Sequence, residues 1–188
     1  MEKYHPMKSL APRDVVAKPC GPLSIKHVLG PPKSDPDALA EAVAEACAML
    51  RSAKRPVILA GVEIHRFGLQ RLLMDFIEET GLPVAATLLG KSVVAENHPQ
   101  YLGIYEGAMG REEVRRTVED SDCVLIFGAF MTDINLGIYT SNIDTNRIIN
   151  ATSARISIRH HHYEEVLLRD FMDGLLKTAV DQPKKLGL

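Results

Sequence analysis

The triplet Gly90-Lys91-Ser92 ends the phosphate-binding loop of many ATPases, so it is the first candidate for nucleotide chemistry. That loop also needs a glycine five positions before Gly90, because its backbone wraps closely round phosphate oxygens, and this chain has Ala85 there. It further needs a helix directly after the lysine and serine, whereas only six residues separate Ser92 from Pro99. We therefore interpret the triplet as a polar turn at the end of a strand.

The stretch GVEIHRFG, residues 61 to 68, follows an apolar run and is the second candidate. A dinucleotide-binding turn reads GxGxxG, but Glu63 stands in the place of the second glycine and would repel a pyrophosphate. Glu63, His65 and Arg66 could instead form a polar pocket for a small acid, in which Arg66 meets a carboxylate with two hydrogen bonds. The alternative, a solvated loop or a contact with another domain, is the more common use of a polar loop.

The stretch GAFMTDINLG, residues 128 to 137, is the third candidate. Thr132, Asp133 and Asn135 could line a site at the end of a buried strand, but the same residue types are common in turns and helix caps, and we favour capping. The candidates for ligand binding or for contact between domains are, over the three loops, Glu63, His65, Arg66, Thr87, Gly90, Lys91, Thr132 and Asp133.

The stretch RHHHYEE, residues 159 to 165, concentrates three of the seven histidines. Adjacent histidines do not point the same way on a helix or on a strand, so we interpret the stretch as a solvated bend and not as a metal site. The sequence contains no serine elbow, no HExxH motif and no readable set of nucleophile, base and orienting group. From the residues alone we predict a fold but no catalytic centre.

Apolar runs and helical periodicities alternate along the chain and predict the elements that position these loops. Asp35-Pro36 offers a cap and a proline at the first helical position, which begins a helix over residues 35 to 53. The other predicted helices lie near Leu69 to Ile77, with Gly81 as the stop after it, around Val114 and Val118, and over 168 to 180. The predicted strands are 55 to 61, 82 to 87, 123 to 129, 147 to 151 and 155 to 158.

This alternation predicts a three-layer, Rossmann-like α/β domain with a mainly parallel sheet of about six strands. Ligands of such sheets usually bind at the carboxyl ends of the strands, which here means the loops that start at Gly61, Thr87 and Gly128. Residues 1 to 34 hold six prolines and read as an extended lead-in, residues 35 to 180 as the domain, and residues 181 to 188 as a tail.

The composition excludes several classes of function. The chain has 188 residues, a hydrophobic content of 46% and a formal net charge of -2, which fits a globular domain without an electrostatic footprint for nucleic acid. No apolar run is long enough for a membrane span or a signal peptide, so we predict a cytoplasmic protein. Cys20, Cys47 and Cys123 lie far apart and form no CxxC pair, which is typical of reduced thiols.

Four segments together resemble the central domain of thiamine diphosphate-dependent 2-oxo-acid decarboxylases, in the branch of the pyruvate, indolepyruvate and phenylpyruvate decarboxylases. The segments are RPVILAGVEIHRFGL, GLPVAATLLGKSVVAENHPQYLGIYEG, VEDSDCVLIFGAFMTDINLGIYT and VLLRDFMDGLL. The resemblance runs from about residue 36 to residue 176. The family's pattern is matched in order and spacing by Gly90-Lys91, Glu96, His98-Pro99, Tyr101, Gly103 and Gly107.

The resemblance implies a parent enzyme that uses thiamine diphosphate and magnesium, and it implies no cofactor on this chain itself. APRDVV, residues 11 to 16, looks like the end of the preceding pyrimidine-binding domain. The glutamate that activates the pyrimidine and the Gly-Asp-Gly to Asn stretch that holds magnesium and diphosphate are not matched in this sequence. The implied partners are the flanking pyrimidine-binding and diphosphate-binding domains, with a homo-oligomer as a further option.

Two hypotheses follow. In the first, the chain is the structural central domain of a decarboxylase, or carboxy-lyase, that removes carbon dioxide from an aryl- or alkyl-pyruvate, and the chain alone is inactive. In the second, it is a stand-alone module that senses a nucleotide or a 2-oxo acid at the strand-end loops. The resemblance at residues 11 to 16 favours the first.

Overall fold

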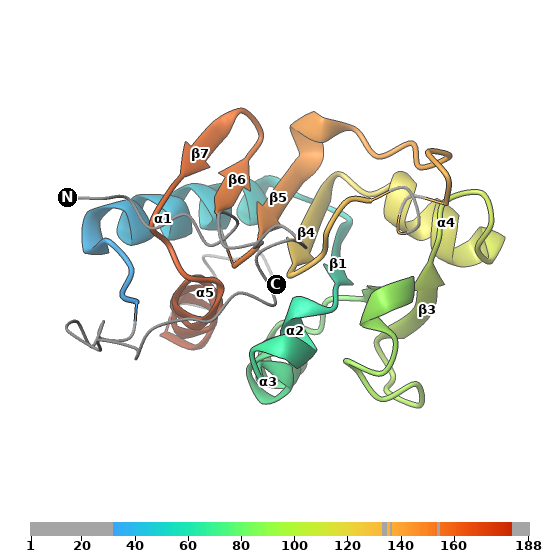
Figure 1. Ribbon diagram of the computed structural model, residues 1–188, viewed down its shortest axis with the longest axis horizontal. Helices are drawn as coiled ribbons and strands as arrows, with labels where there is room; N and C mark the ends of the chain where they lie inside the picture. Colours follow the sequence, from blue (N-terminus) through green and yellow to red (C-terminus); the bar gives the residue numbers. More distant parts are fainter. Residues whose placement is uncertain (1–31, 133–134, 136, 154, 182–188) are drawn as a thin grey trace, which may run out of the picture. The chain divides into compact units, whose positions relative to one another are not determined.

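The computed structural model describes residues 32–132, 135, 137–153 and 155–181 (Figure 1). The strands are β1 (Pro56–Ala60), β2 (Val84–Thr87), β3 (Tyr101–Tyr105), β4 (Cys123–Phe127), β5 (Ile148–Ala151), β6 (Ile156–Ile158) and β7 (His161–Tyr163). The helices are α1 (Pro36–Ser52), α2 (Glu63–Arg66), α3 (Gln70–Thr80), α4 (Glu112–Glu119) and α5 (Leu168–Asp181), with short 3-10 helices η2 (Leu88–Gly90) and η3 (Thr145–Arg147).

The strands form one seven-stranded sheet in the order β3-β2-β1-β4-β5-β6-β7 (Figure 1). Neighbouring strands from β3 to β5 are parallel, and Ile58 of β1 is in register with Val84 of β2 and with Leu125 of β4. β6 and β7 are antiparallel to their neighbours. The strand order reverses at β1, because β2 and β3 lie on one side of it and β4 and β5 on the other. The predicted α/β fold with a mainly parallel sheet is confirmed.

Local signals in the sequence explain where the helices begin and end. Asp35 caps α1, and its carboxylate accepts hydrogen bonds from the backbone N–H groups of Asp37 and Ala38 at 3.0 and 2.9 Å. Gly81 ends α3 in the left-handed conformation, with φ of 66°, as a glycine after a helix does without steric cost. Both signals were predicted from the sequence and both are confirmed.

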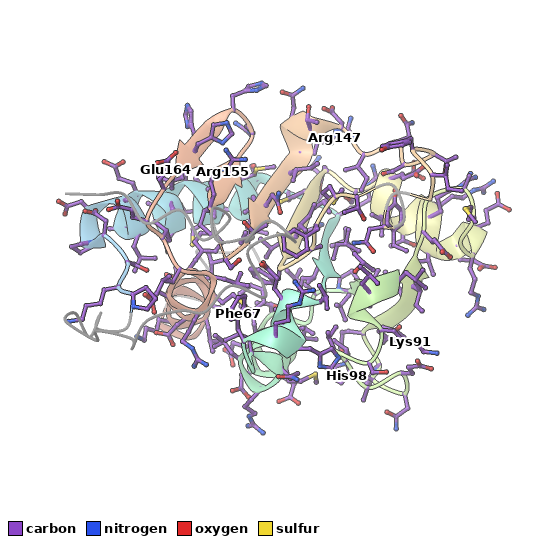
Figure 2. All side chains as sticks on the ribbon, viewed as in Figure 1. Phe67, Lys91, His98, Arg147, Arg155 and Glu164 are labelled. Carbon is purple, nitrogen blue, oxygen red and sulfur yellow. The ribbon has the colours of Figure 1, made fainter. Side chains whose placement is uncertain are left out.

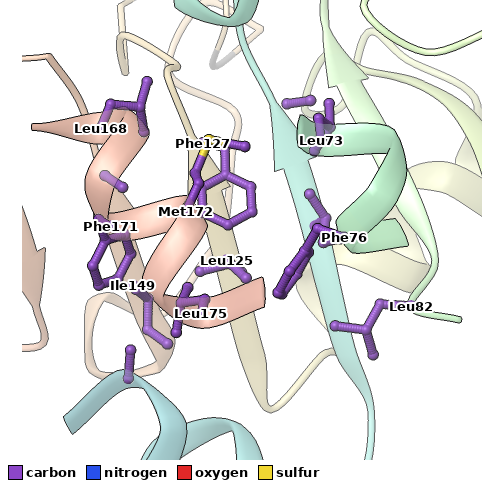
Figure 3. Packing of buried hydrophobic residues seen from close by; sticks show 14 of the residues in the cluster. Leu73, Phe76, Leu82, Leu125, Phe127, Ile149, Leu168, Phe171, Met172 and Leu175 are labelled. Carbon is purple, nitrogen blue, oxygen red and sulfur yellow. The ribbon is translucent and has the colours of Figure 1, made fainter. Parts of the chain in front are cut away.

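The sheet is buried on both faces, which is why its central strands are continuous apolar runs. Ile58 and Ala60 of β1 face the core that packs under α1, α3 and α5, while Val57 and Leu59 face the core under α4. In the first core, the ring of Phe76 meets that of Phe127 edge-on, with centroids 5.6 Å apart and an interplanar angle of 84° (Figure 3). The sheet is therefore the middle one of three layers.

The strands β3 and β7 were not predicted from the sequence. With them the sheet has seven strands, where about six were expected. β3 lies at one edge, contains Gly103 at φ of 128°, and buries only Tyr105 fully, so it carries no continuous apolar run. β7 lies at the other edge and consists of two exposed histidines and a half-buried tyrosine, where we predicted a solvated bend. Edge strands pair on one side only, so weak patterns suffice for them.

Candidate functional site at the carboxyl ends of the strands

The three predicted loops meet at the carboxyl ends of β1, β2 and β4. A Cβ on Gly61, which follows β1, would lie 2.3 Å from the Cα of Ala129 and 2.3 Å from the carbonyl oxygen of Gly128. A Cβ on Gly90, after β2, would lie 2.5 Å from the carbonyl oxygen of Ala60. These backbones are therefore in direct contact, because only glycine permits such an approach.

Backbone hydrogen bonds also join the segment after β1 to the carboxyl end of β4. The N–H of Gly61 donates to the carbonyl of Phe127 at 2.8 Å, and the N–H of Glu63 donates to that of Gly128 at 3.0 Å. In a Rossmann-type nucleotide site, N–H groups at this position face a phosphate. Here the N–H groups of Gly61 and Glu63 donate instead to Phe127 at the end of β4 and to Gly128 in the loop after it.

Glu63 is buried at the start of α2, with 2% of its surface exposed. Its carboxylate accepts two hydrogen bonds from Ser153, which lies between β5 and β6: one from the backbone N–H at 2.9 Å and one from the hydroxyl at 2.5 Å. The interpretation of this stretch as a solvated loop is wrong for Glu63, because residues 63 to 66 form a helix whose first carboxylate pairs inside the protein, whereas residues 65 to 68 are exposed. A buried carboxylate needs such donors, since burial without them is costly.

The side chains of His65 and Arg66 contact different residues from those that the Glu63 carboxylate contacts. The Nε2–H of His65 donates to the carbonyl of Lys91 at 3.2 Å, and its Nδ1 lies 2.9 Å from the side-chain nitrogen of Gln70. The guanidinium carbon of Arg66 lies 5.7 Å from the centroid of the Phe130 ring, a cation–π distance. These two side chains link α2 to the loops on either side of it.

Thr87 and Gly90 have a structural role in the turn after β2. The buried hydroxyl of Thr87 accepts a hydrogen bond from the N–H of Gly90 at 3.2 Å and so caps η2. Lys91 lies beyond it, 3.9 Å from the carboxylate of Glu96, and both side chains are exposed. The interpretation of Gly90-Lys91-Ser92 as a polar turn after a strand is confirmed, because η2 and turns follow β2 and the next α-helix along the chain, α4, begins only at Glu112.

The third loop is held by its own polar side chains. The hydroxyl of Thr132 accepts from the N–H of Asn135 at 3.5 Å, and the amide of Asn135 donates to the carbonyl of Phe130 at 2.7 Å. These contacts are typical of a turn. Asp133 lies outside the described residues.

Ser153 is the residue of this site that the sequence analysis missed. It lies 90 positions from Glu63, between two short strands, where a serine predicts no more than a turn. Only the sheet topology brings β5 and its following turn next to the end of β1 through β4. No local signal could have identified this contact.

The histidines of the stretch 159 to 165 are separated by their partners. His160 pairs with Asn146, His161 with Glu45, and His162 with Ser157, each at 3.0 Å. Across the part of the chain that the structure describes, no group of three or more histidine, cysteine, aspartate or glutamate side chains could hold a metal ion.

Neither the thiol of Cys123 nor the described helices add a function to the described part. Burial raises the pKa of the Cys123 thiol to about 12, so this cysteine carries no thiolate at neutral pH and is a core residue. None of the described helices combines the length and the apolar character that a bilayer span requires.

Comparison with known proteins identifies the domain. The family described as "Thiamine pyrophosphate enzyme, central domain" matches residues 43–176. The chain is 34% identical over 143 residues to the indole-3-pyruvate decarboxylase of Azospirillum brasilense, which covers 76% of this chain and 26% of that protein. It is 33% identical over 151 residues to pyruvate decarboxylase isozyme 2 of Saccharomyces cerevisiae, which covers 80% and 27% respectively. The chain thus spans about a quarter of the length of these relatives, and it belongs to the family of thiamine pyrophosphate enzyme central domains.

Proposed function

We propose that the chain is the structural central domain of a thiamine diphosphate-dependent 2-oxo-acid decarboxylase and that it catalyses nothing by itself. The parent enzyme releases carbon dioxide from an aryl- or alkyl-pyruvate, a substrate class that the names of the relatives support. The observation that carries the proposal is the closed carboxyl edge of the sheet, where Gly61, Gly90 and Gly128 bring three loops into contact.

The closed edge supports a spacer in preference to a binding domain. Nucleotides bind parallel sheets at the point where the strand order reverses, which is β1 in this fold. Loops in backbone contact leave no room for a phosphate at that point, and the buried carboxylate of Glu63 adds a negative charge there. A domain built in this way can still hold its neighbours at a set distance, because its strand ends are packed against one another.

The residues described do not fit thiamine diphosphate or magnesium. They contain no cluster of carboxylates or histidines for a metal ion, and the N–H groups of Gly61 and Glu63 at the reversal point are already paired with carbonyls. We therefore derive no chemical step through the cofactor on this chain. In the proposal, thiamine diphosphate and magnesium belong to the pyrimidine-binding and diphosphate-binding domains of the parent, and residues 1 to 34 form the lead-in from the first of these.

The parent is further proposed to act in the cytoplasm. Cys123 is a buried free thiol, as expected in a reducing compartment. Cell fractionation with an antibody against the chain tests the location. Recovery in the membrane or extracellular fraction would contradict it.

The experiment that tests the main proposal compares the 188-residue chain with the natural polypeptide that carries it. Carbon dioxide release from phenylpyruvate, indolepyruvate and pyruvate is measured with thiamine diphosphate and magnesium present. We expect release by the natural polypeptide and none by the 188-residue chain. No release by the natural polypeptide from any of these acids would refute the decarboxylase assignment.

The alternative of a ligand-sensing module is not favoured, and calorimetry tests it directly. ADP, FAD and phenylpyruvate are titrated separately into the 188-residue chain, and we expect no binding. A dissociation constant tighter than about 1 mM for any of them would favour the module, because a spacer needs no such affinity. A Glu63→Gln variant that gains affinity for ADP would show that the buried carboxylate is what excludes the phosphate.

A further inference from the structure

A cavity of about 620 Å³ lies at the amino edge of the sheet, where the chain enters β1, β2 and β4. Three segments line it: the one between α1 and β1, the one between α3 and β2, and the carboxyl end of α4 with the turn after it. Its volume is in the range of sites that bind small molecules. The cavity lies at the opposite edge from the strand-end loops, and the proposed function makes no use of it.

Part of the lining is apolar and well packed. Val57 and Leu82 are only 1% and 5% exposed, and Ala53, Pro56 and Pro83 complete this part. The two prolines have no backbone N–H, so this part of the cavity offers few hydrogen-bond donors. It therefore favours a ligand with an apolar group, whose burial against these side chains contributes to binding.

Positive charge enters the cavity from the segment between α1 and β1. The backbone N–H groups of Lys54 and Arg55 donate to the carboxylate of Asp122, which holds the backbone of this segment in place. The charge of Arg55 helps to lower the pKa of Asp122, but neither cationic side chain forms an ion pair with another described residue. A guanidinium beside an ammonium group is suited to receive the carboxylate of a ligand.

Negative charge enters from the carboxyl end of α4. Arg116 on this helix also lines the cavity, but it is already paired with Glu112 one turn before it. Asp120 is the C-cap of α4, is exposed and also lines the cavity. The carboxyl end of a helix carries a partial negative charge, to which Asp120 adds a full one. This part of the lining therefore favours a positively charged group of a ligand.

The two kinds of charge follow helices on opposite faces of the sheet, since α1 packs on one core and α4 on the other. We propose that the amino-edge cavity binds a free α-amino acid with an apolar side chain. The carboxylate of this ligand pairs with Arg55 and Lys54, and its ammonium group pairs with Asp120 at the end of α4. Its side chain packs on Val57 and Leu82.

The charge pattern separates this ligand from the ones considered above. Phenylpyruvate has no ammonium group, so it would leave Asp120 without a partner and bring a second negative charge near it. ADP and FAD would bring more negative charge still. Amino acids with aryl or alkyl side chains are what transamination of the corresponding pyruvates yields, so this ligand shares its carbon skeleton with the proposed substrates. The inference goes beyond the proposed function and does not rest on it, because every lining residue belongs to the described part of the chain.

Isothermal titration calorimetry on the natural polypeptide that carries the chain tests the proposal. L-Phenylalanine is the probe, 3-phenylpropionate lacks its ammonium group, and 2-phenylethylamine lacks its carboxylate. We expect a dissociation constant of about 1 mM or tighter for L-phenylalanine. Both analogues should bind at least about tenfold more weakly, because each leaves one charge of the cavity without a partner.

Three variants assign the contacts. Asp120→Asn should weaken L-phenylalanine about tenfold and should not weaken 3-phenylpropionate, which has no group for Asp120 to pair with. Arg55→Gln should weaken L-phenylalanine and 3-phenylpropionate and leave 2-phenylethylamine unchanged. Glu113→Gln is the matched control, because it removes a negative charge from an exposed position of α4 outside the lining, and it should keep the wild-type affinity.

Three results would overturn the proposal. They are no binding of L-phenylalanine tighter than about 10 mM, equal affinities for L-phenylalanine and 3-phenylpropionate, and an Asp120→Asn variant that keeps the wild-type affinity. The decarboxylation assay on the same preparations separates this inference from the proposed function. Active protein without binding of L-phenylalanine refutes the amino acid site alone, whereas binding without activity refutes the decarboxylase assignment alone.

Discussion

The two edges of the sheet differ in what they leave open. At the carboxyl edge, Gly61 and Gly90 bring backbones into contact and the exposed surface is apolar. At the amino edge, where β1, β2 and β4 begin, a cavity of about 620 Å³ remains, and its charged lining includes Lys54, Arg55 and Arg116. Figure 2 shows Phe67 and Lys91 in the lower half of the view and Arg147, which directly precedes β5 at the amino edge, in the upper half.

The difference shows that space in a parallel sheet does not by itself mark the functional edge. The amino edge collects the carboxyl ends of α1, α3 and α4, whose partial negative charges favour nearby cations such as Lys54 and Arg55. The basic lining of its open cavity therefore has a structural explanation. At the carboxyl edge the loops after β1, β2 and β4 are in backbone contact, and large apolar side chains such as Met109 and Tyr139 are exposed beyond them.

The largest expected effect comes from filling the contact at the carboxyl edge. Gly61→Ala places a methyl group against the backbone of Gly128 and Ala129, which cannot move aside as a side chain can. We expect the free energy of unfolding to fall by at least about 3 kcal/mol, measured by urea denaturation.

Gly68→Ala is the matched control for this change. Gly68 has a φ of 63° but nothing within 4 Å of its added Cβ, so its loss should be limited to backbone strain of about 1 kcal/mol. Equal losses in the two variants would mean that the loops separate easily and that the carboxyl edge is not closed.

The next effect comes from the hydrogen bonds that bury Glu63. Ser153→Ala removes the hydroxyl that donates to the carboxylate, and we expect a loss of about 2 kcal/mol because a buried charged acceptor is left with fewer donors. Ser157→Ala on β6, whose hydroxyl pairs with exposed His162, should change the free energy of unfolding by less than about 0.5 kcal/mol. A neutral Ser153→Ala would indicate that water reaches Glu63.

At the amino edge, the carboxylate of Asp122 accepts two hydrogen bonds, from the backbone N–H groups of Lys54 and Arg55 at 2.8 and 2.9 Å. We expect Asp122→Ala to cost about 1 kcal/mol at pH 7, a low value because the pair is near the surface. Asp120→Ala, in the lining of the same cavity, should cost less, because the side chain of Asp120 has no hydrogen bond to the described residues.

The stabilisation that Asp122 provides depends on pH in a defined direction. Burial acts to raise the pKa of Asp122, but the backbone hydrogen bonds from Lys54 and Arg55 outweigh it, so the folded-state pKa lies below the usual value. The stabilisation is therefore present above the unfolded pKa of about 3.9 and is lost as the pH falls through the folded value. Urea midpoints from pH 7 to pH 2 should show wild type and Asp122→Ala converging at the acid end. A constant difference would contradict this assignment.

The smallest expected effect compares one leucine from each edge. Leu89 in η2 at the carboxyl edge is 48% exposed, and Leu89→Ser should change the stability of the 188-residue chain by less than about 0.5 kcal/mol. Leu82 lines the amino-edge cavity yet is only 5% exposed, and Leu82→Ser should cost about 2 kcal/mol or more. A loss for Leu89→Ser that matches the loss for Leu82→Ser would show that Leu89 packs inside the domain.

Elements with strong local patterns were predictable. The cap at Asp35, the stop at Gly81 and the apolar run of β4 each act through residues within a few positions of one another. The edge strands β3 and β7 were not predictable, because an edge strand gains its hydrogen bonds from one neighbour that lies far away in the sequence.

The sequence by itself therefore determined the order of helices and strands, the parallel sheet and the three loops at its carboxyl edge, since propensity, capping and periodicity are local. Only the tertiary structure decided what those loops do. It placed Ser153 against Glu63 across 90 positions, brought the backbones round Gly61 into contact, and left large apolar side chains such as Met109 and Tyr139 exposed. The physical reason is that contact between distant segments depends on sheet order and packing, which no window of neighbouring residues contains.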